Sequence, residues 1–256
     1  NTPLRYPGGK SNLSDLLGTI IETNNLSGGI YIEPFAGGAG AAINLLFEEY
    51  INSIILNDAD KSIYLFWKSI LYETENLIKL IHNTSVTIDE WKRQRRVFKN
   101  QGSFSELEIG FATFFLNRCN RSGILYAGPI GGQDQSGKWK INERFNKINL
   151  IKRIEKIALY KSRIRLCNKD AISFLEEDVG KIAKLNSKIF VYLDPPYYRK
   201  GSQLYLNYYL PEDHVRLAEF IKNQVSYKWL ISSDNIQHVW EVYKDMELKR
   251  LNLNYF

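Results

Sequence analysis

The first sixty residues alternate between short apolar runs and segments whose apolar positions recur at helical spacing. Residues 14–23 and 41–50 have the spacing of amphipathic helices. Residues 29–33 and 53–58 are apolar runs of strand length that flank the second helix. A strand, a helix and a second strand in this order form the βαβ unit of a parallel sheet. The pattern therefore predicts that the chain begins an α/β fold.

Residues 61–160 have a different pattern, in which helical spacing dominates. It predicts four helices, the third of them capped by Ser103 or Ser105; they cover residues 61–83, 87–100, 104–117 and 150–160. Between the last two, residues 123–137 contain five glycines and one proline and are followed by the short extended run 138–141. Extended runs flanking a glycine-rich tip predict a β-hairpin.

The strand pattern resumes after residue 160. Strands are predicted over residues 163–166, 189–193 and 228–232, helices over residues 171–175, 213–222 and 236–243, and residues 248–256 alternate like a further strand. We therefore predict one α/β domain, formed by residues 1–60 and 161–256, that is interrupted by a mainly helical insert, residues 61–160. Because the sequence starts at Asn1 rather than Met and ends within the alternating stretch, we expect it to be part of a longer chain.

Composition alone excludes few classes of protein. Of the 256 residues 44% are hydrophobic and 24% are charged, as in ordinary globular domains. No apolar run approaches the roughly 18 residues that a membrane helix needs, so no membrane association is expected. The two cysteines, Cys119 and Cys167, are typical of a reducing compartment, here the cytoplasm. Three scattered histidines and no cysteine–histidine pairing argue against a metal site.

The net charge of +6 is concentrated in the insert. Residues 61–160 contain 17 Lys and Arg against 9 Asp and Glu, whereas the rest of the chain contains 17 against 19. Such a local excess predicts a polyanionic partner, because basic side chains that neutralise phosphates release condensed counterions. A solvated helical face that happens to be basic is the alternative.

The clearest candidate for chemistry is the sequence Asp194-Pro195-Pro196-Tyr197, which directly follows the predicted strand 189–193. Proline lacks a backbone N–H, so two in succession end the strand and stiffen the turn. An acid is thus held at the carboxyl end of a strand, where open α/β sheets bind ligands. An acid that merely ends a strand before a tight turn is the alternative.

Three further segments are candidates for binding a small anionic or nucleoside ligand. Residues 33–40 form a glycine-rich turn between a strand and its helix, where glycines allow close approach and positive φ, or only tight packing. Asp58 ends the next strand, where an acid can accept ribose hydroxyls or cap a helix. Lys10 follows two glycines before a helix and can reach an anion. Its spacing does not match a P-loop, which disfavours ATP hydrolysis.

Together these segments resemble a known family. Tyr6-Pro7-Gly8-Gly9-Lys10, the turn 33–40, Asn57-Asp58, Asp194-Pro195-Pro196-Tyr197 and residues 230–235 occur in the order seen in Dam-type (D12 class, α group) DNA adenine-N6 methyltransferases. The similarity extends over essentially the whole chain. It implies a Rossmann-like, S-adenosylmethionine-dependent methyltransferase sheet with an inserted, mainly helical DNA-recognition domain that carries a β-hairpin.

The resemblance also implies roles for individual residues. Tyr6 and Lys10 would hold the methionine end of S-adenosylmethionine, Asp58 its ribose, and Asp170 would lie near its adenine. The residues expected to bind the cofactor, or its product S-adenosylhomocysteine, are Tyr6, Pro7, Gly8, Gly9, Lys10, Glu33, Pro34, Phe35, Gly37, Gly38, Gly40, Asp58, Asp170, Ala171 and Asp194.

In the implied chemistry Asp194 and the Pro195 carbonyl accept the amino hydrogens of a flipped adenine, and Tyr197 stacks on the base. Asp194, Pro195, Pro196 and Tyr197 are therefore the expected catalytic residues. No metal is required. The acid favours adenine, since cytosine-N4 enzymes of this class typically have Ser in its place.

DNA contacts are expected from two parts of the insert. Lys92, Arg93, Arg95 and Arg96 form a dense basic cluster, which is either a phosphate track or a solvated face. Residues 116–126 resemble the target-recognition region of a Dam-like subgroup. There we expect contacts from Arg118, Asn120, Arg121, Ser122, Ile124 and Tyr126, with Ile124, Leu125 or Tyr126 as a wedge in the base stack. Hairpin packing and an internal role for Arg118 are the alternatives.

Other functions remain open from the sequence alone. They are a cytosine-N4 or RNA amino-methyltransferase and a catalytically silent DNA-binding homologue. The expected partner is double-stranded DNA, with a cognate restriction endonuclease as a second candidate, in a monomer or weak dimer of bacterial or phage origin. The hairpin residues differ from those of GATC-methylating members, so the target sequence is not predicted.

Overall fold

The centre of the molecule is a five-stranded parallel sheet. A computed structural model describes residues 2–5, 13–196 and 209–250. The strands are β1 (Ile30–Glu33), β2 (Ser53–Asn57), β3 (Ile164–Cys167), β4 (Ile189–Leu193) and β5 (Lys228–Ile231). Their order across the sheet is β3-β2-β1-β4-β5, and every neighbouring pair is parallel. The predicted α/β class and the five internal strands are confirmed to within a residue or two.

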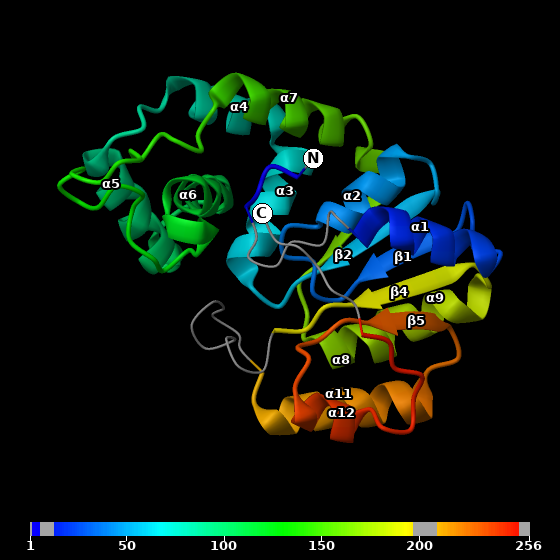
Figure 1. The fold of residues 1–256 in the computed structure, drawn as a ribbon. Helices are drawn as coiled ribbons and strands as arrows, with labels where there is room; N and C mark the ends of the chain where they lie inside the picture. Colours follow the sequence, from blue (N-terminus) through cyan, green and yellow to red (C-terminus); the bar gives the residue numbers. More distant parts are fainter. Residues whose placement is uncertain (1, 6–12, 197–208, 251–256) are drawn as a thin grey trace.

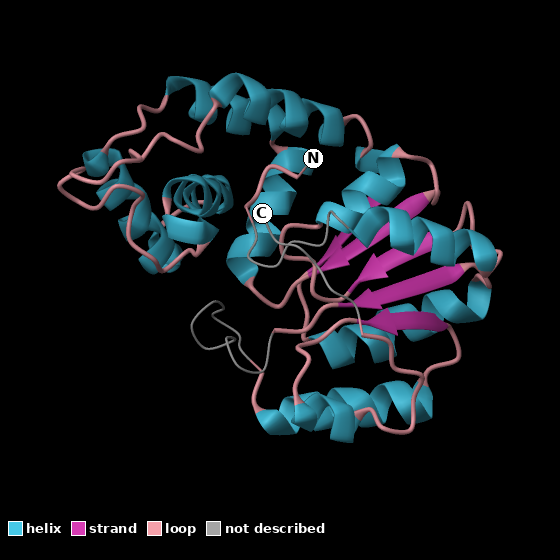
Figure 2. Cartoon of the chain, in the orientation of Figure 1, coloured by secondary structure: helices cyan, strands magenta, loops and turns pink. Residues whose placement is uncertain are grey.

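This strand order contains a reversal. The chain moves outward from β1 through β2 to β3 and then returns to place β4 on the other side of β1. The carboxyl ends of β1 and β4 therefore lie next to each other at the point where the winding changes direction, which is where open α/β sheets bind their ligands. In Figure 2 the arrowheads of the strands point toward the helices of the predicted insert.

Both faces of the sheet are buried. Phe190 and Tyr192 of β4 pack in one apolar cluster, and Ile189, Val191 and Leu193 pack in a second one, as the alternation of side chains along a strand requires. Figure 1 shows α1 (Ser14–Thr23) and α2 (Gly40–Phe47) on one side of the sheet. The opposite side is covered by α8 (Ala171–Phe174), α9 (Gly180–Leu185), α11 (Pro211–Gln224) and α12 (Gln237–Val242). Burial on both faces explains why β4 is apolar throughout.

The middle of the chain is helical, as predicted. It contains α3 (Lys61–Tyr72), α4 (Thr74–Asn83), α5 (Ile88–Lys99), α6 (Glu106–Cys119) and α7 (Lys147–Ala158). Of the two candidate caps for the third predicted helix, Ser105 forms a reciprocal capping box with Glu108. Helices α3 and α6 approach closely at Gly110, where a Cβ atom would overlap the side chain of Ser69.

The prediction of one continuous helix over residues 61–83 was wrong. Glu73 has φ −128° and ψ 31°, which ends α3 and starts α4 in a new direction. The Thr74 hydroxyl donates a hydrogen bond to the Ile70 carbonyl over 2.6 Å and thereby satisfies a group that the broken helix leaves open. The break lets α3 pack on α6 while α4 packs on α7.

The predicted β-hairpin is also wrong. Residues 123–141 form turns without strands, and the region has one isolated bridge, between Asn120 and Pro129. The Gln135 side chain accepts a hydrogen bond from Ile141 N and donates to the carbonyls of Ile130 and Gly132. One side chain thus satisfies backbone groups that a strand ladder would otherwise pair.

The predicted insert shares its core with the sheet. A single apolar cluster contains Tyr31 and Leu56 of the sheet together with Phe66 of α3, Phe114 of α6 and Ile154 of α7. The insert is therefore built onto one face of the sheet domain, and the two-domain division stays a prediction. At the C-terminus residues 248–250 have no regular structure, and the rest of the predicted last strand lies outside the described residues. None of the helices that the structure describes is long and apolar enough to cross a membrane.

Candidate active site

Asp194 lies at the carboxyl end of β4, where Pro195 and Pro196 follow it. The Ser232 hydroxyl, just beyond β5, donates a 2.6 Å hydrogen bond to Asp194 Oδ1. The Tyr192 hydroxyl lies 2.8 Å from Ser232 Oγ. It donates to that oxygen, because Ser232 already donates its own proton to Asp194. The carboxylate is therefore oriented by a short chain of hydroxyl groups from two strands.

The glycine-rich turn lies beside this acid. Ile32 of β1 pairs with Val191 of β4, so Pro34 and Asp194 leave neighbouring strands at the same edge of the sheet. Adjacent strands are about 4.8 Å apart. The structure thus brings together two motifs that are 160 residues apart in the sequence, at the point where the strand order reverses.

The turn itself is held by contacts from Asp58, which follows β2, and from α3. Gly37 N donates to Asp58 Oδ2 over 2.8 Å, and Trp67 of α3 donates from Nε1 to the Gly37 carbonyl over 2.9 Å. Gly37 has a φ of 46°, and so does Ala39, a non-glycine residue at the start of α2. Of the three glycines of this turn, Gly37, Gly38 and Gly40, only Gly37 has a positive φ. A left-handed alanine is strained, which indicates that the surrounding contacts fix this conformation.

Glu33, at the end of β1, links the strand to the start of α2. Its Oε1 atom accepts hydrogen bonds from the Tyr31 hydroxyl over 3.1 Å and from Ala42 N in the first turn of α2 over 3.2 Å. A carboxylate at this position satisfies a helix N–H and is favoured by the helix dipole. Burial and the charge of Glu33 raise the pKa of Tyr31. The predicted cofactor residue therefore has a clear role in shaping the turn.

Asp58 at the end of β2 is an acid of the site with a strongly raised pKa. Burial and the neighbouring charge of Asp60 raise its pKa to about 7. Its oxygens accept hydrogen bonds from Gly37 N and from Asp60 N over 2.8 and 2.9 Å. Because a carboxylate oxygen can accept more than one hydrogen bond, both oxygens keep capacity for ligand hydroxyls.

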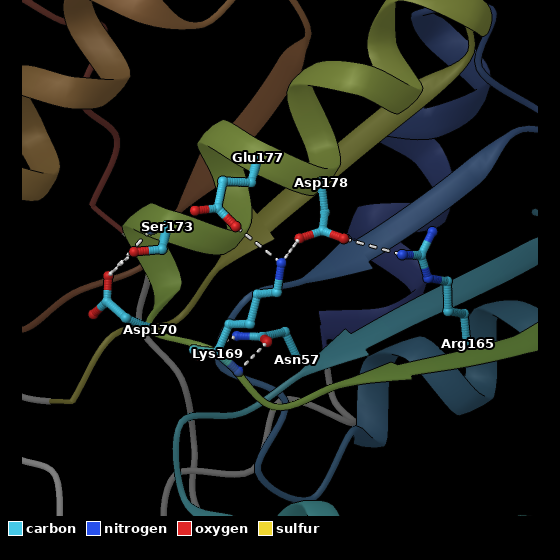
Figure 3. Close-up of polar contacts among 7 residues, drawn as sticks. All are labelled: Asn57, Arg165, Lys169, Asp170, Ser173, Glu177 and Asp178. Atoms are coloured by element: carbon cyan, nitrogen blue, oxygen red, sulfur yellow. Dashed lines mark hydrogen bonds and ion pairs between the residues drawn. The ribbon is translucent and has the colours of Figure 1, made fainter.

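The loop after β3 completes this edge of the sheet (Figure 3). The buried Asn57 side chain donates to the carbonyls of Pro34 and Lys169 and accepts from Lys169 N, all over 3.0 Å. Lys169 Nζ forms ion pairs with Glu177 and Asp178. Asp170 caps α8, because its Oδ1 atom accepts from Ile172 N and Ser173 N. The loop that carries Asp170 and Ala171 is thus fixed to the turn after β1.

Two aromatic residues lie beside these acids. The rings of Phe35 and Tyr209 meet edge to face with centroids 5.5 Å apart. The Tyr209 hydroxyl is buried and has no hydrogen-bond partner among the described residues, and the charge of Asp170 acts on it. The acceptor oxygens of Asp58 and the ring of Phe35, in the turn that Asp58 holds, fit a nucleoside such as that of S-adenosylmethionine.

Part of the predicted site lies outside the described residues. This applies to Tyr6, Pro7, Gly8, Gly9 and Lys10 and to Tyr197, whose roles stay predictions. Within the part of the chain that the structure describes, no group of His, Cys, Asp and Glu could hold a metal ion.

The predicted basic cluster lies on α5. Trp91, Gln94, Val97 and Phe98 form the buried side of this helix, so Lys92, Arg93 and Arg96 are exposed and Arg95 is half-buried. Arg93 pairs with Glu90, and Arg95 lies over the ring of Trp91 at 4.9 Å. The helix therefore has an exposed basic face, while its opposite face is buried in the protein.

Two of the predicted DNA contacts have internal roles instead. Asn120 is fully buried; it accepts from Trp91 Nε1 over 2.6 Å and donates to the carbonyls of Ile124 and Leu125. Arg118 donates from Nε and Nη2 to the Arg144 carbonyl, and burial lowers its pKa to about 10. The expectation that these side chains contact DNA is therefore corrected: they hold the loop in shape, and the internal alternative for Arg118 is the one observed.

Most of the remaining predicted contact residues of the loop are exposed. Arg121, Ser122 and Tyr126 are exposed, whereas Ile124 is half-buried. The Tyr126 ring packs on Phe98 of α5 with centroids 5.3 Å apart. Burial and the charge of Asp60 raise the Tyr126 pKa to about 12. The loop thus packs against the basic helix through Tyr126.

Sequence reasoning missed three positioning residues. Ser232 and Asn57 stood inside quoted motifs but had no assigned role. Asn117 of α6 accepts from Arg5 N and donates to the Arg5 carbonyl, both over 2.7 Å, and so holds the residue that precedes Tyr6. No local pattern could have identified Asn117, because its partner is 112 residues away.

Comparison with known proteins agrees with this arrangement. A family model described as D12 class N6 adenine-specific DNA methyltransferase matches residues 6–255. The type II methyltransferase M.MjaIII of Methanocaldococcus jannaschii is 25% identical over 269 residues, which cover 97% of this chain and 89% of that protein. The modification methylase StsI of Streptococcus sanguinis is 24% identical over 209 residues, 77% of this chain but only 28% of that protein.

The family match confirms the resemblance inferred from the five motifs, and the parallel sheet confirms the Rossmann-like methyltransferase fold. Asp194, the turn after β1 and Asp58 meet at one edge of this sheet. The chain belongs to the D12 class of N6 adenine-specific DNA methyltransferases.

Proposed function

We propose that this protein transfers a methyl group from S-adenosylmethionine to N6 of an adenine in double-stranded DNA, and releases S-adenosylhomocysteine and the proton that N6 loses. The observation that carries the proposal is the position of Asp194, which Ser232 orients beside the turn after β1. Family membership supports the reaction class. The cofactor, the duplex substrate and the residue roles are our inference.

Asp194 is the proposed catalytic acceptor. The exocyclic amine of adenine is a poor nucleophile because its lone pair is delocalised into the ring. Asp194 and the Pro195 carbonyl accept its two hydrogens, which favours sp³ geometry at nitrogen. The hydrogen bond from Ser232 fixes the direction of the carboxylate before the base arrives, so little reorganisation is needed in the transition state.

The proposed cofactor site runs along the carboxyl edge of the sheet. Asp58 holds the ribose hydroxyls, Phe35 and the glycine-rich turn lie along the nucleoside, and Asp170 lies near its adenine. Tyr6 and Lys10 are assigned to the methionine end through the resemblance alone. When bound, S-adenosylmethionine supplies an electrophilic methyl group on its sulfonium. The protein contributes orientation of the two reactants, which can account for several orders of magnitude in rate.

The proposed DNA surface combines α5 with the loop 120–126. Lys92, Arg93 and Arg96 on the exposed face of α5 would follow the phosphates, and Arg121 and Tyr126 would approach the bases. The amine of a stacked adenine cannot be reached in a duplex, so the base must be flipped out at a cost of a few kcal/mol. Contacts from this basic surface offset that cost. We propose that the insert is the DNA-recognition domain.

The relatives carry the names type II methyltransferase and modification methylase. Such names support a role as the modification partner of a restriction endonuclease, in the cytoplasm where the DNA is, and we include this role in the proposal.

The test is a methylation assay with purified protein, unmethylated duplex DNA and labelled S-adenosylmethionine, followed by mass spectrometry of the nucleosides. The proposal expects N6-methyladenine and no N4-methylcytosine. N4-methylcytosine, or labelled RNA in a parallel reaction with no labelled DNA, would support the alternative enzyme classes. Binding of cofactor and DNA without any transfer would support a catalytically silent homologue.

A further inference from the structure

Two buried tyrosines occupy equivalent places on neighbouring strands of the sheet. Tyr31 of β1 lies two residues before Glu33, and Tyr192 of β4 lies two residues before Asp194. Both rings belong to the same apolar cluster and stack with centroids 6.5 Å apart. A phenylalanine could fill either place, and burying a hydroxyl costs free energy unless it is hydrogen-bonded. The two hydroxyl groups therefore need an explanation of their own.

The hydroxyl groups reach the two acids by different routes. The Tyr31 hydroxyl donates directly to Glu33 Oε1 over 3.1 Å. The Tyr192 hydroxyl instead lies 2.8 Å from Ser232 Oγ, and Ser232 donates to Asp194 Oδ1 over 2.6 Å. The hydrogen bond to the proposed catalytic acid thus passes through a side chain that can rotate.

Ser232 would not hold one orientation by itself. Its backbone is fixed, because Ser232 N donates to the Leu193 carbonyl over 2.9 Å. Its side chain has three staggered positions, and its proton can turn toward any acceptor. A hydrogen bond from Tyr192 occupies one lone pair of Oγ and leaves the serine proton for Asp194. Tyr192 itself is held by burial in the middle layer of the protein.

We propose that Tyr192 is a positioning residue for methyl transfer: by donating to Ser232 it maintains the hydrogen bond that orients Asp194 toward the target amine. This inference rests on the proposed function, because it assumes that Asp194 accepts a hydrogen of that amine. Since Tyr192 acts through Ser232, its effect falls on the rate of transfer and depends on the presence of the serine hydroxyl.

The experiment measures single-turnover methyl transfer to unmethylated duplex DNA by wild type and Tyr192→Phe, together with thermal unfolding of both proteins. Tyr192→Phe is expected to transfer roughly 3- to 10-fold more slowly, the range of one neutral hydrogen bond. KM for S-adenosylmethionine and for DNA should stay nearly unchanged. The unfolding measurement gives the folded fraction, so that each rate refers to folded protein.

A double-mutant cycle tests whether Tyr192 acts through Ser232. Residues that work through a shared partner have non-additive effects. Once Ser232→Ala has removed the intermediate hydroxyl, Tyr192→Phe should slow transfer no further. The double variant should therefore be as fast as Ser232→Ala alone.

Tyr31→Phe is the matched comparison. It removes a hydroxyl from the neighbouring strand, from the same apolar cluster and from the other ring of the stack. Its hydrogen bond belongs to Glu33, however, and not to Ser232. Whatever its size, the effect of Tyr31→Phe on the rate should be the same with and without the Ser232 hydroxyl.

Equal rates for folded wild type and folded Tyr192→Phe would overturn this inference and leave the proposed function intact. So would a full additional loss from Tyr192→Phe in the Ser232→Ala background, or a loss confined to KM. Failure of the wild-type protein to methylate duplex DNA would instead contradict the proposed function, and this inference with it.

Discussion

The carboxyl edge of the sheet and the loop 120–126 both carry predicted functional residues, but the two regions use their polar side chains differently. At the sheet edge, Asp194 and Asp58 are placed by the strands that they follow. In the loop, neighbouring residues diverge: Asn120 is buried among backbone carbonyls, whereas Arg121 next to it is exposed. A motif at a strand end can therefore be assigned from sequence, whereas in an irregular loop the residue type alone does not separate structural from binding roles.

The largest expected effect is at the sheet edge. Asp194→Ala should lower the methyl-transfer rate at least about 100-fold, the scale seen when a preorganised transition-state partner is removed. Binding of S-adenosylhomocysteine should change far less than the rate, since the catalytic role proposed for Asp194 is toward the target amine. The measurement is single-turnover transfer from labelled S-adenosylmethionine. Near wild-type turnover would remove Asp194 from the mechanism.

The second prediction separates the two arginines of the loop region. Arg118→Ala should destabilise the protein by about 1 to 2 kcal/mol, because the charged hydrogen bonds to the Arg144 carbonyl are lost. Arg121→Ala should leave stability unchanged and weaken DNA binding about tenfold, with a smaller dependence on salt. Chemical denaturation and DNA titration at several salt concentrations measure both quantities. The opposite pattern would show that the exposed and buried side chains were assigned the wrong way round.

The third prediction concerns the residue that orients Asp194. Ser232→Ala should lower kcat roughly tenfold and leave KM for both substrates nearly unchanged, because one hydrogen bond to a charged group is lost. Ser232→Thr, which keeps the hydroxyl, should recover most of the rate. A rise in KM with normal kcat would instead indicate a role in binding.

The smallest expected effect is a pH dependence of cofactor binding. With the Asp58 pKa raised to about 7, the carboxylate is mostly protonated at pH 6 and mostly ionised at pH 8. Ribose hydroxyls donate to the ionised form, so affinity should rise with pH, by up to about tenfold between pH 6 and 8. Asp58→Asn should bind more weakly and flatten the profile. Affinity that falls with rising pH in the wild type would contradict the assignment.

Much of the fold followed from the sequence because strands and helices have distinct periods. The parallel sheet, the helical middle segment and the placing of Asp194 at a strand end needed only local patterns. The break at Glu73 was not predictable, because Thr74 and the packing of α4 on α7 decide it. The prediction of a hairpin was wrong for a similar reason, since the Gln135 side chain bonds backbone groups that a strand ladder would have paired.

The residues of the candidate site form the same two groups: those that local patterns predict and those that depend on distant partners. Asp58 and the glycine-rich turn were identified by their position in the βαβ unit. Ser232, Asn57 and Asn117 act on partners that are distant in the sequence, such as the Asp194 carboxylate and the Arg5 backbone. Asn120 was misassigned because its burial depends on Trp91, which lies 29 residues away. Local sequence patterns therefore do not predict contacts between residues that are far apart in the sequence.

The central claim is that methyl transfer takes place where the turn after β1 meets Asp194. A crystal structure with S-adenosylhomocysteine and a duplex would test it most directly. The account predicts that the ribose hydroxyls bind Asp58, that the sulfur points toward Asp194, and that an extruded adenine places its amino group within hydrogen-bond distance of that carboxylate. A ligand bound away from this edge of the sheet, or an adenine amine that does not approach Asp194, would contradict it.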